Sequence, residues 1–285
     1  MSLPRWLLKT MPEYSQVAQT KQALAAVNTI CHNASCPNIM ECFSGKHAAF
    51  LILGDRCTRN CSFCNVRHAM PVTPDAAEPE RVAQAAAKLG LKHVVITSVS
   101  RDDLTDGGAG QFVRTILALR HIPGATVEVL VPDFNGNEPS LLKVIEAGPD
   151  VLAHNLETVS RLQPFIRPQA NYDRSLWVLR KTKEKNHRIL IKSGLMLGLG
   201  ETDSEILKTL ADLKANGCDI LTLGQYRQPS VEHLAVNRFV LDEGFAMFRE
   251  EAEKMGFCKV FAGSYVRSSY RAGDIRGLLE VHADG

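Results

Sequence analysis

From residue 49 onward the chain alternates between strand-like and helix-like segments, and this alternation restricts the possible folds more than any other feature. Apolar runs rich in β-branched residues predict strands at 49–54, 93–98, 126–131, 150–154, 188–197, 219–224 and 259–262. Helical patterns lie between them, at 78–89, 111–119, 140–147, 172–185, 204–216 and 241–255. Strands that alternate with helices form right-handed βαβ units around a parallel sheet. Six such units are too few for a closed eightfold barrel, so we predict an α/β fold of the TIM type, a partial (β/α)6 barrel.

Composition and charge favour a cytoplasmic protein that binds neither nucleic acid nor a membrane. The chain has 285 residues, of which 45% are hydrophobic and 22% are charged, as in one large soluble domain. Its net charge of +2 is too small to suggest a nucleic acid or an anionic membrane as partner. No apolar run is long enough to cross a bilayer, and the first residues lack the apolar core of a signal peptide.

The chain divides into three segments of different character. Residues 1–48 form an N-terminal extension, in which Pro4, Pro12 and the apolar patch Trp6-Leu7-Leu8 suggest a segment laid across the barrel, followed by a helix over 14–28. Residues 49–257 form the barrel itself. Residues 258–285 contribute a last strand and an extension that we expect to close over the barrel mouth.

Cys57, Cys61 and Cys64 follow the first predicted strand with the spacing C-x3-C-x2-C. Three thiolates suit three corners of a [4Fe–4S] cluster and leave the fourth iron open for a small chelating ligand. A structural zinc ion requires four protein ligands, and ferredoxins use x2 gaps and a fourth cysteine followed by proline. A zinc knuckle and a ferredoxin-type electron carrier are the alternatives to be tested against the rest of the chain.

Cys31, Cys36 and Cys42 form a second triplet, with the spacing C-x4-C-x5-C. We expect it to hold a second cluster, which needs a fourth ligand. Ser269 in the run Arg267-Ser268-Ser269-Tyr270 follows the last strand and is a candidate, although a serine oxygen is a hard and unusual ligand for iron and a serine pair is more often a loop or a helix cap. The remaining cysteines, Cys218 and Cys258, precede strands, and we expect both to be buried thiols.

Polar and glycine-rich groups follow the predicted strands where each one ends. In barrels of this kind the functional groups lie on these loops, so we expect them to meet at one mouth. They include Ser98, Gly107-Gly108, Asp133, Asn155, Glu157, Lys192, Met196, Gln225 and Ser269.

The local pattern C-x3-C-x-F-C, with Phe63 before the last cysteine, resembles the radical S-adenosylmethionine (SAM) superfamily. The resemblance implies that the open iron binds SAM and that SAM is cleaved reductively to a carbon radical. It also implies that Asn155 and Glu157 bond the ribose and the amino group, that Arg167 pairs with the SAM carboxylate, and that Gly107-Gly108 and the Gly194–Gly198 run approach SAM closely. An ion pair between Glu157 and Arg167 is the structural alternative. The other candidate cofactor contacts are Phe63, Ser98, Lys192, Met196 and Gln225.

The two triplets together with the C-terminal Arg-Ser-Ser-Tyr run are similar to the lipoyl synthase family. Further motifs carry the resemblance over nearly the whole chain: Cys36-Pro-Asn-Ile-Met-Glu-Cys42, Leu53-Gly54-Asp55, Arg101-Asp102-Asp103, Val131-Pro132-Asp133-Phe134, His154-Asn155-Leu156-Glu157-Thr158 and Gly224-Gln225-Tyr226. It implies two [4Fe–4S] clusters, SAM, Ser269 as the fourth ligand of the auxiliary cluster, and this cluster as the donor of two sulfur atoms to C6 and C8 of an octanoyl chain.

The same resemblance implies the partners. The octanoyl chain is carried on a lysine of a lipoyl domain, either of a 2-oxoacid dehydrogenase acyltransferase subunit or of the glycine cleavage H protein, and reduced ferredoxin or flavodoxin supplies electrons. We expect a monomer, because the sequence shows no obvious exposed apolar helix. A relative of biotin synthase or of the methylthiotransferases, and an iron–sulfur electron carrier, are the competing functions.

Some positions depart from the commoner family pattern: Phe43, Ser160, Gln169, Arg227 and Ala235. Arg227 replaces an apolar residue, Phe43 a tryptophan and Ala235 a proline. None is a predicted metal ligand, and they leave open a different preference among carrier proteins. His233 is either a substrate-facing residue or a solvated loop histidine.

Overall fold

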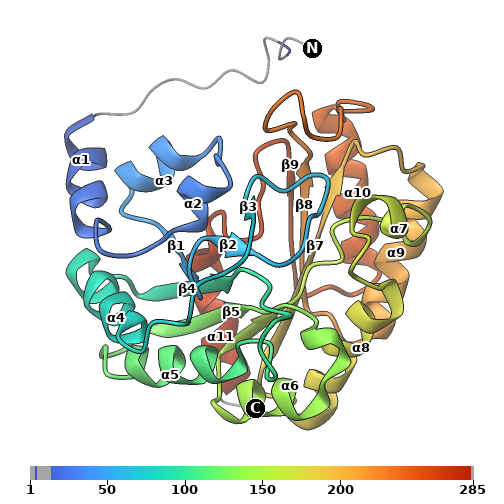
Figure 1. Cartoon of the computed structure of the whole chain (residues 1–285). Coiled ribbons are helices and arrows are strands. Elements are labelled where there is room, and N and C mark those ends of the chain that lie inside the picture. Colours follow the sequence, from blue (N-terminus) through green and yellow to red (C-terminus); the bar gives the residue numbers. More distant parts are fainter. Residues whose placement is uncertain (1–3, 5–13, 284–285) are drawn as a thin grey trace.

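The computed structural model describes residue 4 and residues 14–283. Its main sheet contains the strands β1 (Ala49–Ile52), β4 (His93–Ser98), β5 (Thr126–Leu130), β6 (Val151–Ala153), β7 (Leu190–Leu197), β8 (Ile220–Gln225) and β9 (Lys259–Gly263), all parallel and in chain order. The edge strands β1 and β9 are not paired with each other, so the described sheet does not close. The predicted partial barrel is confirmed (Figure 1). The expected course of Trp6-Leu7-Leu8 and Pro12 lies outside the described residues.

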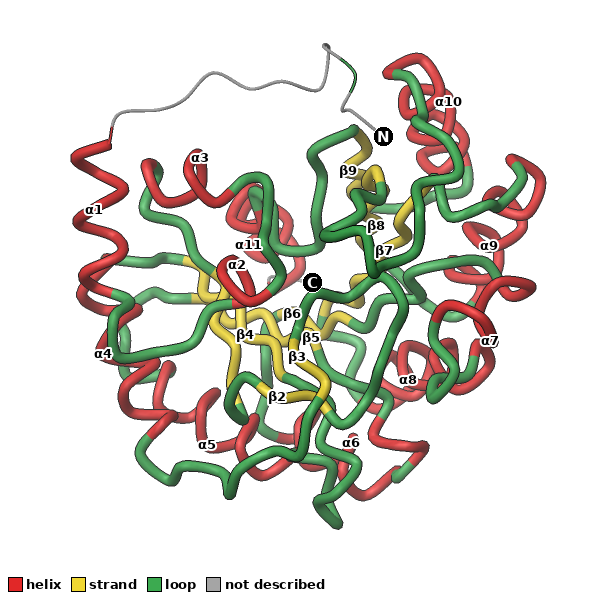
Figure 2. The backbone as a smooth tube through the Cα atoms, turned by 45° about the horizontal axis from the view of Figure 1, so that its top comes forward, coloured by secondary structure: helices red, strands yellow, loops and turns green. Residues whose placement is uncertain are grey.

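The longer helices between successive strands lie around the sheet (Figure 2). They are α4 (Glu78–Leu89), α5 (Ala109–Leu119), α6 (Glu138–Glu146), α8 (Tyr172–Lys185), α9 (Asp203–Ala215) and α10 (Asp242–Lys254). Local signals set their ends: Gly90 closes α4 in the left-handed conformation, and Thr202 with Glu205 forms a capping box at the start of α9. The bounds agree with the predicted helices to within a few residues.

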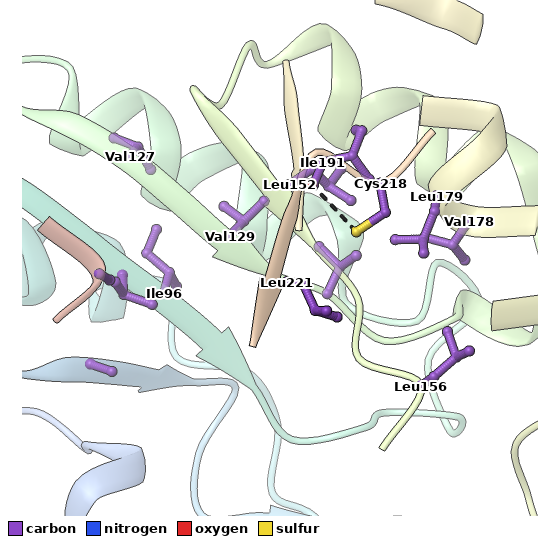
Figure 3. Close-up of a cluster of buried hydrophobic side chains, with 14 of the residues drawn as sticks. Ile96, Val127, Val129, Leu152, Leu156, Val178, Leu179, Ile191, Cys218 and Leu221 are labelled. Atoms are coloured by element: carbon purple, nitrogen blue, oxygen red, sulfur yellow. Dashed lines mark hydrogen bonds between the residues drawn. The ribbon is translucent and has the colours of Figure 1, made fainter. Parts of the chain in front are cut away.

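Alternation along the strands separates the packed core from the inside of the barrel. Ile96, Val129, Leu152, Ile191 and Leu221 are buried among the helices, as Figure 3 shows for part of this layer. The neighbouring residues on each strand have the opposite orientation, because successive side chains of a strand point to opposite faces.

The N-terminal part contains three short helices, α1 (Tyr14–Ala23), α2 (Ile30–Asn33) and α3 (Ile39–Ser44). The predicted helix over 14–28 therefore ends early. The chain must turn there, because Thr29 caps α2 and forms a β-bridge with Phe50 next to the sheet. Two short parallel strands that we did not predict, β2 (Arg56–Cys57) and β3 (Arg67–His68), flank the first cysteine triplet.

After β9 the chain lies at the mouth of the barrel and then continues to the opposite end. The 3-10 helix η4 (Ala272–Ile275) leads into α11 (Arg276–Ala283). Ile275 packs against Val151, Leu190 and Ile220, which are the first residues of their strands. The C-terminal segment therefore extends well beyond the predicted closure of the mouth.

The two isolated cysteines differ from each other. Cys218 is fully buried, as expected, and lies in the core between Ile191 and Leu179 (Figure 3). Cys258 is exposed, so the prediction of a buried thiol was wrong there. It stands one residue before β9, in the stretch between α10 and the strand, where the chain faces solvent. None of the helices in the described part combines the length and apolar character that a membrane span requires.

Candidate active site

The carboxyl ends of the strands open into a cavity of about 770 Å³. Inward-facing strand residues form its wall, among them Val95, Thr97, Leu130, Gly194 and Thr222. Barrels of this type have their active sites at this end of the sheet. The volume lies in the upper part of the range of about 300–1,000 Å³ that small-molecule sites occupy.

The first triplet lies on this wall. Cys57, Cys61 and Cys64 all line the cavity, and Phe63 lies with them. Burial raises the pKa of the Cys61 thiol, and it raises the pKa of Cys64 to about 12. The Cys57 sulfur accepts hydrogen bonds from the backbone N–H groups of Arg59, at 3.4 Å, and Ser100, at 3.3 Å.

The second triplet lies on the short N-terminal helices. Cys31 and Cys36 line the same cavity, and burial raises the pKa of Cys31 to about 11. Cys42 on α3 is not part of the cavity lining. It lies next to the contact in which the Tyr270 hydroxyl donates to a carboxylate oxygen of Glu41 at 2.6 Å.

Ser269 approaches the cavity from the other end of the chain. Both Ser268 and Ser269 line it, and Asn38 holds this segment against the second triplet by donating from Nδ2 to the Tyr265 carbonyl at 2.7 Å. The cavity therefore brings soft sulfur donors from two separate elements together with the serine hydroxyls of the C-terminal run, a donor set that suits iron–sulfur clusters. Among the described residues, no three His, Cys, Asp or Glu side chains converge on a single metal ion.

The predicted SAM contacts Ser98, Asn155, Glu157, Arg167 and Met196 also line the cavity. Asn155 lies at the centre of this group: its Nδ2 donates to Glu157 Oε1 at 3.1 Å, and its Oδ1 accepts from the Ser268 hydroxyl at 3.2 Å. The C-terminal Arg-Ser-Ser-Tyr run thus contacts the candidate cofactor site directly.

Glu157 has an unusual backbone conformation, with φ of 66°. Its N–H donates to the Gly194 carbonyl at 3.0 Å, and its own carbonyl accepts from the Met196 N–H at 2.9 Å, so the strained residue is held by β7. Burial raises the pKa of its carboxyl group, and the positive charge of Arg167 opposes this effect. Strain maintained in this way is common where a side chain is aimed into a functional site.

The buried atoms Arg167 Nε and Ser98 Oγ of the cavity wall have no hydrogen-bond partner within the described residues. The Arg167 Nη1 atom donates to the carbonyls of Asn155 and Leu156, at 3.0 Å each, rather than to the Glu157 carboxylate. The guanidinium is thus fixed by backbone with one buried donor still available. Because buried polar atoms are nearly always satisfied, this arrangement fits a polar ligand such as the carboxylate of SAM.

Glycine at position 194 keeps this part of the wall open. A Cβ atom there would collide with the Thr222 hydroxyl and come within 3.3 Å of Asn155 Oδ1. Gly194 lines the cavity, and its expected approach to SAM stays a prediction. At Gly198 the neighbours are instead the Arg238 carbonyl and the Gln225 side chain.

Two predicted cofactor contacts, Lys192 and Gln225, lie outside the cavity lining. The Lys192 ammonium group forms a fully buried ion pair with Glu128 at 2.8 Å, near the start of β7. Gln225 Nε2 donates to the Leu197, Tyr226 and Arg238 carbonyls, and its Oε1 accepts from the Val240 N–H. Since the polar atoms of both side chains are engaged in the scaffold, we remove these residues from the candidate contacts.

The Gly107-Gly108 pair also lies elsewhere. A Cβ at Gly108 would meet the Leu53 side chain, and one at Gly107 would meet the Phe134 ring at 3.0 Å. These glycines allow close packing at the start of α5 rather than approach to a ligand in the cavity. His233 lies outside the lining as well, where its ring contacts the Cys64 carbonyl at 3.2 Å and the Ser230 hydroxyl at 2.9 Å.

Sequence reasoning assigned no role to Arg59, although it lies inside the first cysteine motif. Its side chain is only 4% exposed and forms ion pairs with Asp102 and Asp133. Burial acts against the charged forms, yet these contacts raise the pKa of Arg59 and lower that of Asp133. Nothing local in the sequence marks this role, because the partner aspartates follow the next two strands of the sheet and reach Arg59 only through the fold.

Two further arginines line the cavity between the two triplets, Arg227 and Arg267. The Arg227 guanidinium stacks on the Tyr265 ring, 4.3 Å from its centroid. Burial lowers the pKa of Arg267, and nearby Cys36 and Glu157 act in the opposite direction.

Comparison with known proteins shows the superfamily to which the chain belongs. The model of the radical SAM superfamily matches residues 51–213, more than half of the chain. The solved structure of HydG, a maturase of the [FeFe]-hydrogenase, covers 81% of this chain and 63% of its own, with 16% identity and a TM-score of 0.56. That of methylornithine synthase covers 98% and 91%, with 16% identity and a TM-score of 0.50. At this identity the two structures show the fold alone. The chain is a radical SAM enzyme, and its superfamily implies a [4Fe–4S] cluster and SAM as cofactors.

Relatives that match nearly the whole chain identify its family within this superfamily. Lipoyl synthase of Thiobacillus denitrificans is 52% identical over 274 residues, which cover 95% of this chain and 88% of that protein. Lipoyl synthase of Caldanaerobacter subterraneus is 50% identical over 270 residues, covering 94% and 95%. The chain belongs to the lipoyl synthase family, and it is a radical SAM sulfurtransferase.

Proposed function

We propose that this enzyme inserts two sulfur atoms, at C6 and C8, into an octanoyl chain that is amide-linked to a lysine of a carrier domain. We further propose that an auxiliary [4Fe–4S] cluster is bound by Cys31, Cys36, Cys42 and Ser269 and serves as the sulfur donor. The observation that carries the proposal is the shared cavity: residues of both triplets and Ser269 line one space, so a chain bound there can meet both cluster sites.

When bound, the first cluster and SAM supply a 5′-deoxyadenosyl radical, and the auxiliary cluster supplies sulfide. The residues of this chain hold and orient the reactants. Arg167, Asn155 and Ser98 offer polar groups to SAM. Val95, Leu130, Phe239 and Val266 give the cavity an apolar wall that suits an octanoyl chain and excludes water from it.

The proposed protein substrates are the lipoyl domains of 2-oxoacid dehydrogenase acyltransferase subunits and the glycine cleavage H protein, with reduced ferredoxin or flavodoxin as electron donor. Arg227 bears on the choice among them. It adds a cation to the cavity wall at a position where the family commonly has an apolar residue. We infer that exchanging Arg227 for leucine changes the ratio of kcat/KM values between two carrier proteins more than it changes SAM cleavage.

The proposal is tested by reconstituting the full chain, which should then contain about eight irons. It is incubated with SAM, a reductant and a peptide that carries octanoyl-lysine. Mass spectrometry should show the addition of one sulfur atom and then of a second, together with 5′-deoxyadenosine. Formation of 5′-deoxyadenosine without sulfur insertion would instead favour a relative with another radical reaction.

A further inference from the structure

Arg59 lies within the Cys57–Cys64 loop, yet its side chain is buried against two other loops of the barrel, those after β4 and β5. We propose that Arg59 is a positioning residue that gives this loop its cluster-binding shape before iron is bound and thereby aims two backbone N–H groups at the Cys57 sulfur. This goes beyond the proposed function, since it concerns the first cluster site, which every radical SAM enzyme needs.

The guanidinium group of Arg59 joins loops that follow three successive strands. Its Nε and Nη2 donate to the two carboxylate oxygens of Asp102 at 2.7 and 2.9 Å, and Asp102 follows β4. Nη2 also donates to Asp133 Oδ1 at 2.6 Å and to Asn135 Oδ1 at 2.8 Å, and both of these residues follow β5. A bidentate pair fixes the plane of the guanidinium as well as its position.

The acceptors are themselves fixed, so the loop is tied to rigid elements. Asp133 is fully buried and accepts a second charged hydrogen bond from Arg174 Nε of α8, at 2.7 Å. Asn135 donates from Nδ2 to Asp102 Oδ1 at 2.9 Å, which closes a ring of bonds around Arg59. Two guanidinium groups face two carboxylates here, so the network is balanced in charge and needs no ligand to stabilise it.

Thr58 adds a second connection between the cysteine loop and the loop after β4. Its hydroxyl donates to the Ser100 carbonyl at 3.0 Å and accepts from the Asp102 N–H at 3.1 Å. These bonds hold Ser100 where its N–H reaches the Cys57 sulfur at 3.3 Å, and the backbone of Arg59 itself supplies the other N–H, at 3.4 Å. Hydrogen bonds to a ligand sulfur raise the reduction potential of an iron–sulfur cluster and steady its attachment.

The neighbouring Arg101 provides a matched comparison. It is also buried, with 2% exposure, and forms a bidentate pair with Asp103, at 2.9 Å for both bonds. It also donates to the Leu53 carbonyl, and none of its side-chain hydrogen bonds within the described residues goes to Cys57–Cys64. A lysine in place of either arginine keeps the charge and loses the bidentate geometry, so a general loss of stability should appear in both variants.

The experiment compares Arg59→Lys and Arg101→Lys in full-length protein in which Cys31, Cys36 and Cys42 are serine, so that only the first cluster is measured. In the absence of iron, hydrogen exchange of residues 57–64 reports the shape of the loop. After reconstitution, loss of iron to a chelator and the midpoint potential of the cluster are followed. Asp102→Asn serves as a gentler, isosteric variant of the same network.

Arg59→Lys should speed hydrogen exchange in the loop, speed iron loss about tenfold, as changes around metal ligands commonly do, and lower the midpoint potential. Asp102→Asn should change the exchange rate, the rate of iron loss and the midpoint potential in the same directions, but by smaller amounts. Arg101→Lys should lower the melting temperature and leave the other quantities at parent values. The proposal is overturned if the Arg59 variant matches the parent in exchange, iron loss and potential, or if the Arg101 variant changes them equally.

Discussion

The two cysteine triplets adjoin one cavity, but different parts of the chain hold them. Cys57, Cys61 and Cys64 lie on a loop of the barrel, where the bonds of Arg59 join neighbouring βα loops at sequence separations of 43 and 74 residues. Cys31, Cys36 and Cys42 lie on short helices of the N-terminal part. This part is joined to the C-terminal segment by the hydrogen bonds Asn38–Tyr265 and Tyr270–Glu41, which link residues 227 and 229 positions apart.

This difference indicates that different perturbations should disrupt the two candidate cluster sites. The first site is completed by the same loops that complete the barrel, so it should persist as long as the barrel is folded. The second depends on the docking of both ends of the chain, and terminal segments open at a lower free-energy cost than a core sheet. A perturbation of the termini should therefore separate radical formation from sulfur insertion.

The largest expected effect comes from removing one triplet at a time. Replacing Cys57, Cys61 and Cys64 by alanine should abolish the formation of 5′-deoxyadenosine, because no thiolates remain to attach the cluster that binds SAM. Replacing Cys31, Cys36 and Cys42 should abolish sulfur insertion and leave SAM cleavage. Both products are measured by mass spectrometry in the same reaction.

The double variant Cys218→Ala, Cys258→Ser is the control for general thiol loss, since neither residue lines the cavity. It should retain both products. Loss of SAM cleavage on removal of the second triplet would contradict the division of roles between the two regions.

Ser269→Cys tests the second region by replacing the oxygen of the proposed fourth ligand with sulfur. A thiolate binds iron more strongly than a serine oxygen does, so the variant should still assemble the auxiliary cluster. If release of sulfide depends on a labile oxygen ligand, dithiolated product should fall by at least about tenfold while SAM cleavage persists, in line with the effects of changes near metal ligands. Ser268→Cys is the neighbouring control. A normal yield from Ser269→Cys would refute the role of a labile ligand.

Asn38→Ala tests the docking of the two ends. It leaves the Tyr265 carbonyl without the bond from the Asn38 amide, which costs about 1–3 kcal/mol when the group stays buried. We expect faster loss of the irons of the second site and unchanged retention at the first, followed by EPR and iron analysis during dialysis. Asn216→Ala removes an amide-to-carbonyl bond of the same length, 2.7 Å, far from the cavity. Equal iron loss from both sites would show that the docking is not specific to the second triplet.

Much of the fold could be predicted because the signals are local. The strand β4 and the helices α4 and α8 have the predicted bounds, since an apolar run or a strong helical period coincides with clear capping residues. The short strands β2 and β3 could not be predicted. Each has only two residues, and their pairing depends on the course of the loop between them.

The candidate site, like the fold, could be predicted only where the signal is local in the sequence. Residues placed by the end of a strand, such as Ser98, Asn155 and Glu157, line the cavity as predicted. Lys192 does not line the cavity, because it stands near the start of β7, away from the carboxyl ends of the strands, and pairs with Glu128 there. Only the bounds of β7 in the structure reveal this position. Arg59 was missed because its partners are brought together only by the sheet. Side chains whose role depends on long-range pairing have no local signal.

His154 tests the barrel side of the comparison. It is fully buried, its Nδ1 donates to the Val131 carbonyl at 2.8 Å, and its Nε2 accepts from the Ser175 hydroxyl at 3.0 Å. Burial and the positive charge of Arg167 lower its pKa from 6.5 to about 4, although Asp133 acts in the opposite direction. The ring is therefore neutral in the folded protein at pH 7.

Since the folded pKa is the lower one, the unfolded chain binds the extra proton between pH 6.5 and about 4. The contribution of His154 is complete above pH 6.5, decreases as the pH falls through this window, and decreases no further below about 4. The slope for one proton is about 1.4 kcal/mol per pH unit. Urea unfolding from pH 7 to 4 should show a smaller slope of the unfolding free energy against pH for His154→Gln than for the parent. Equal slopes for His154→Gln and the parent would mean that His154 carries a proton in the folded barrel as readily as in the unfolded chain.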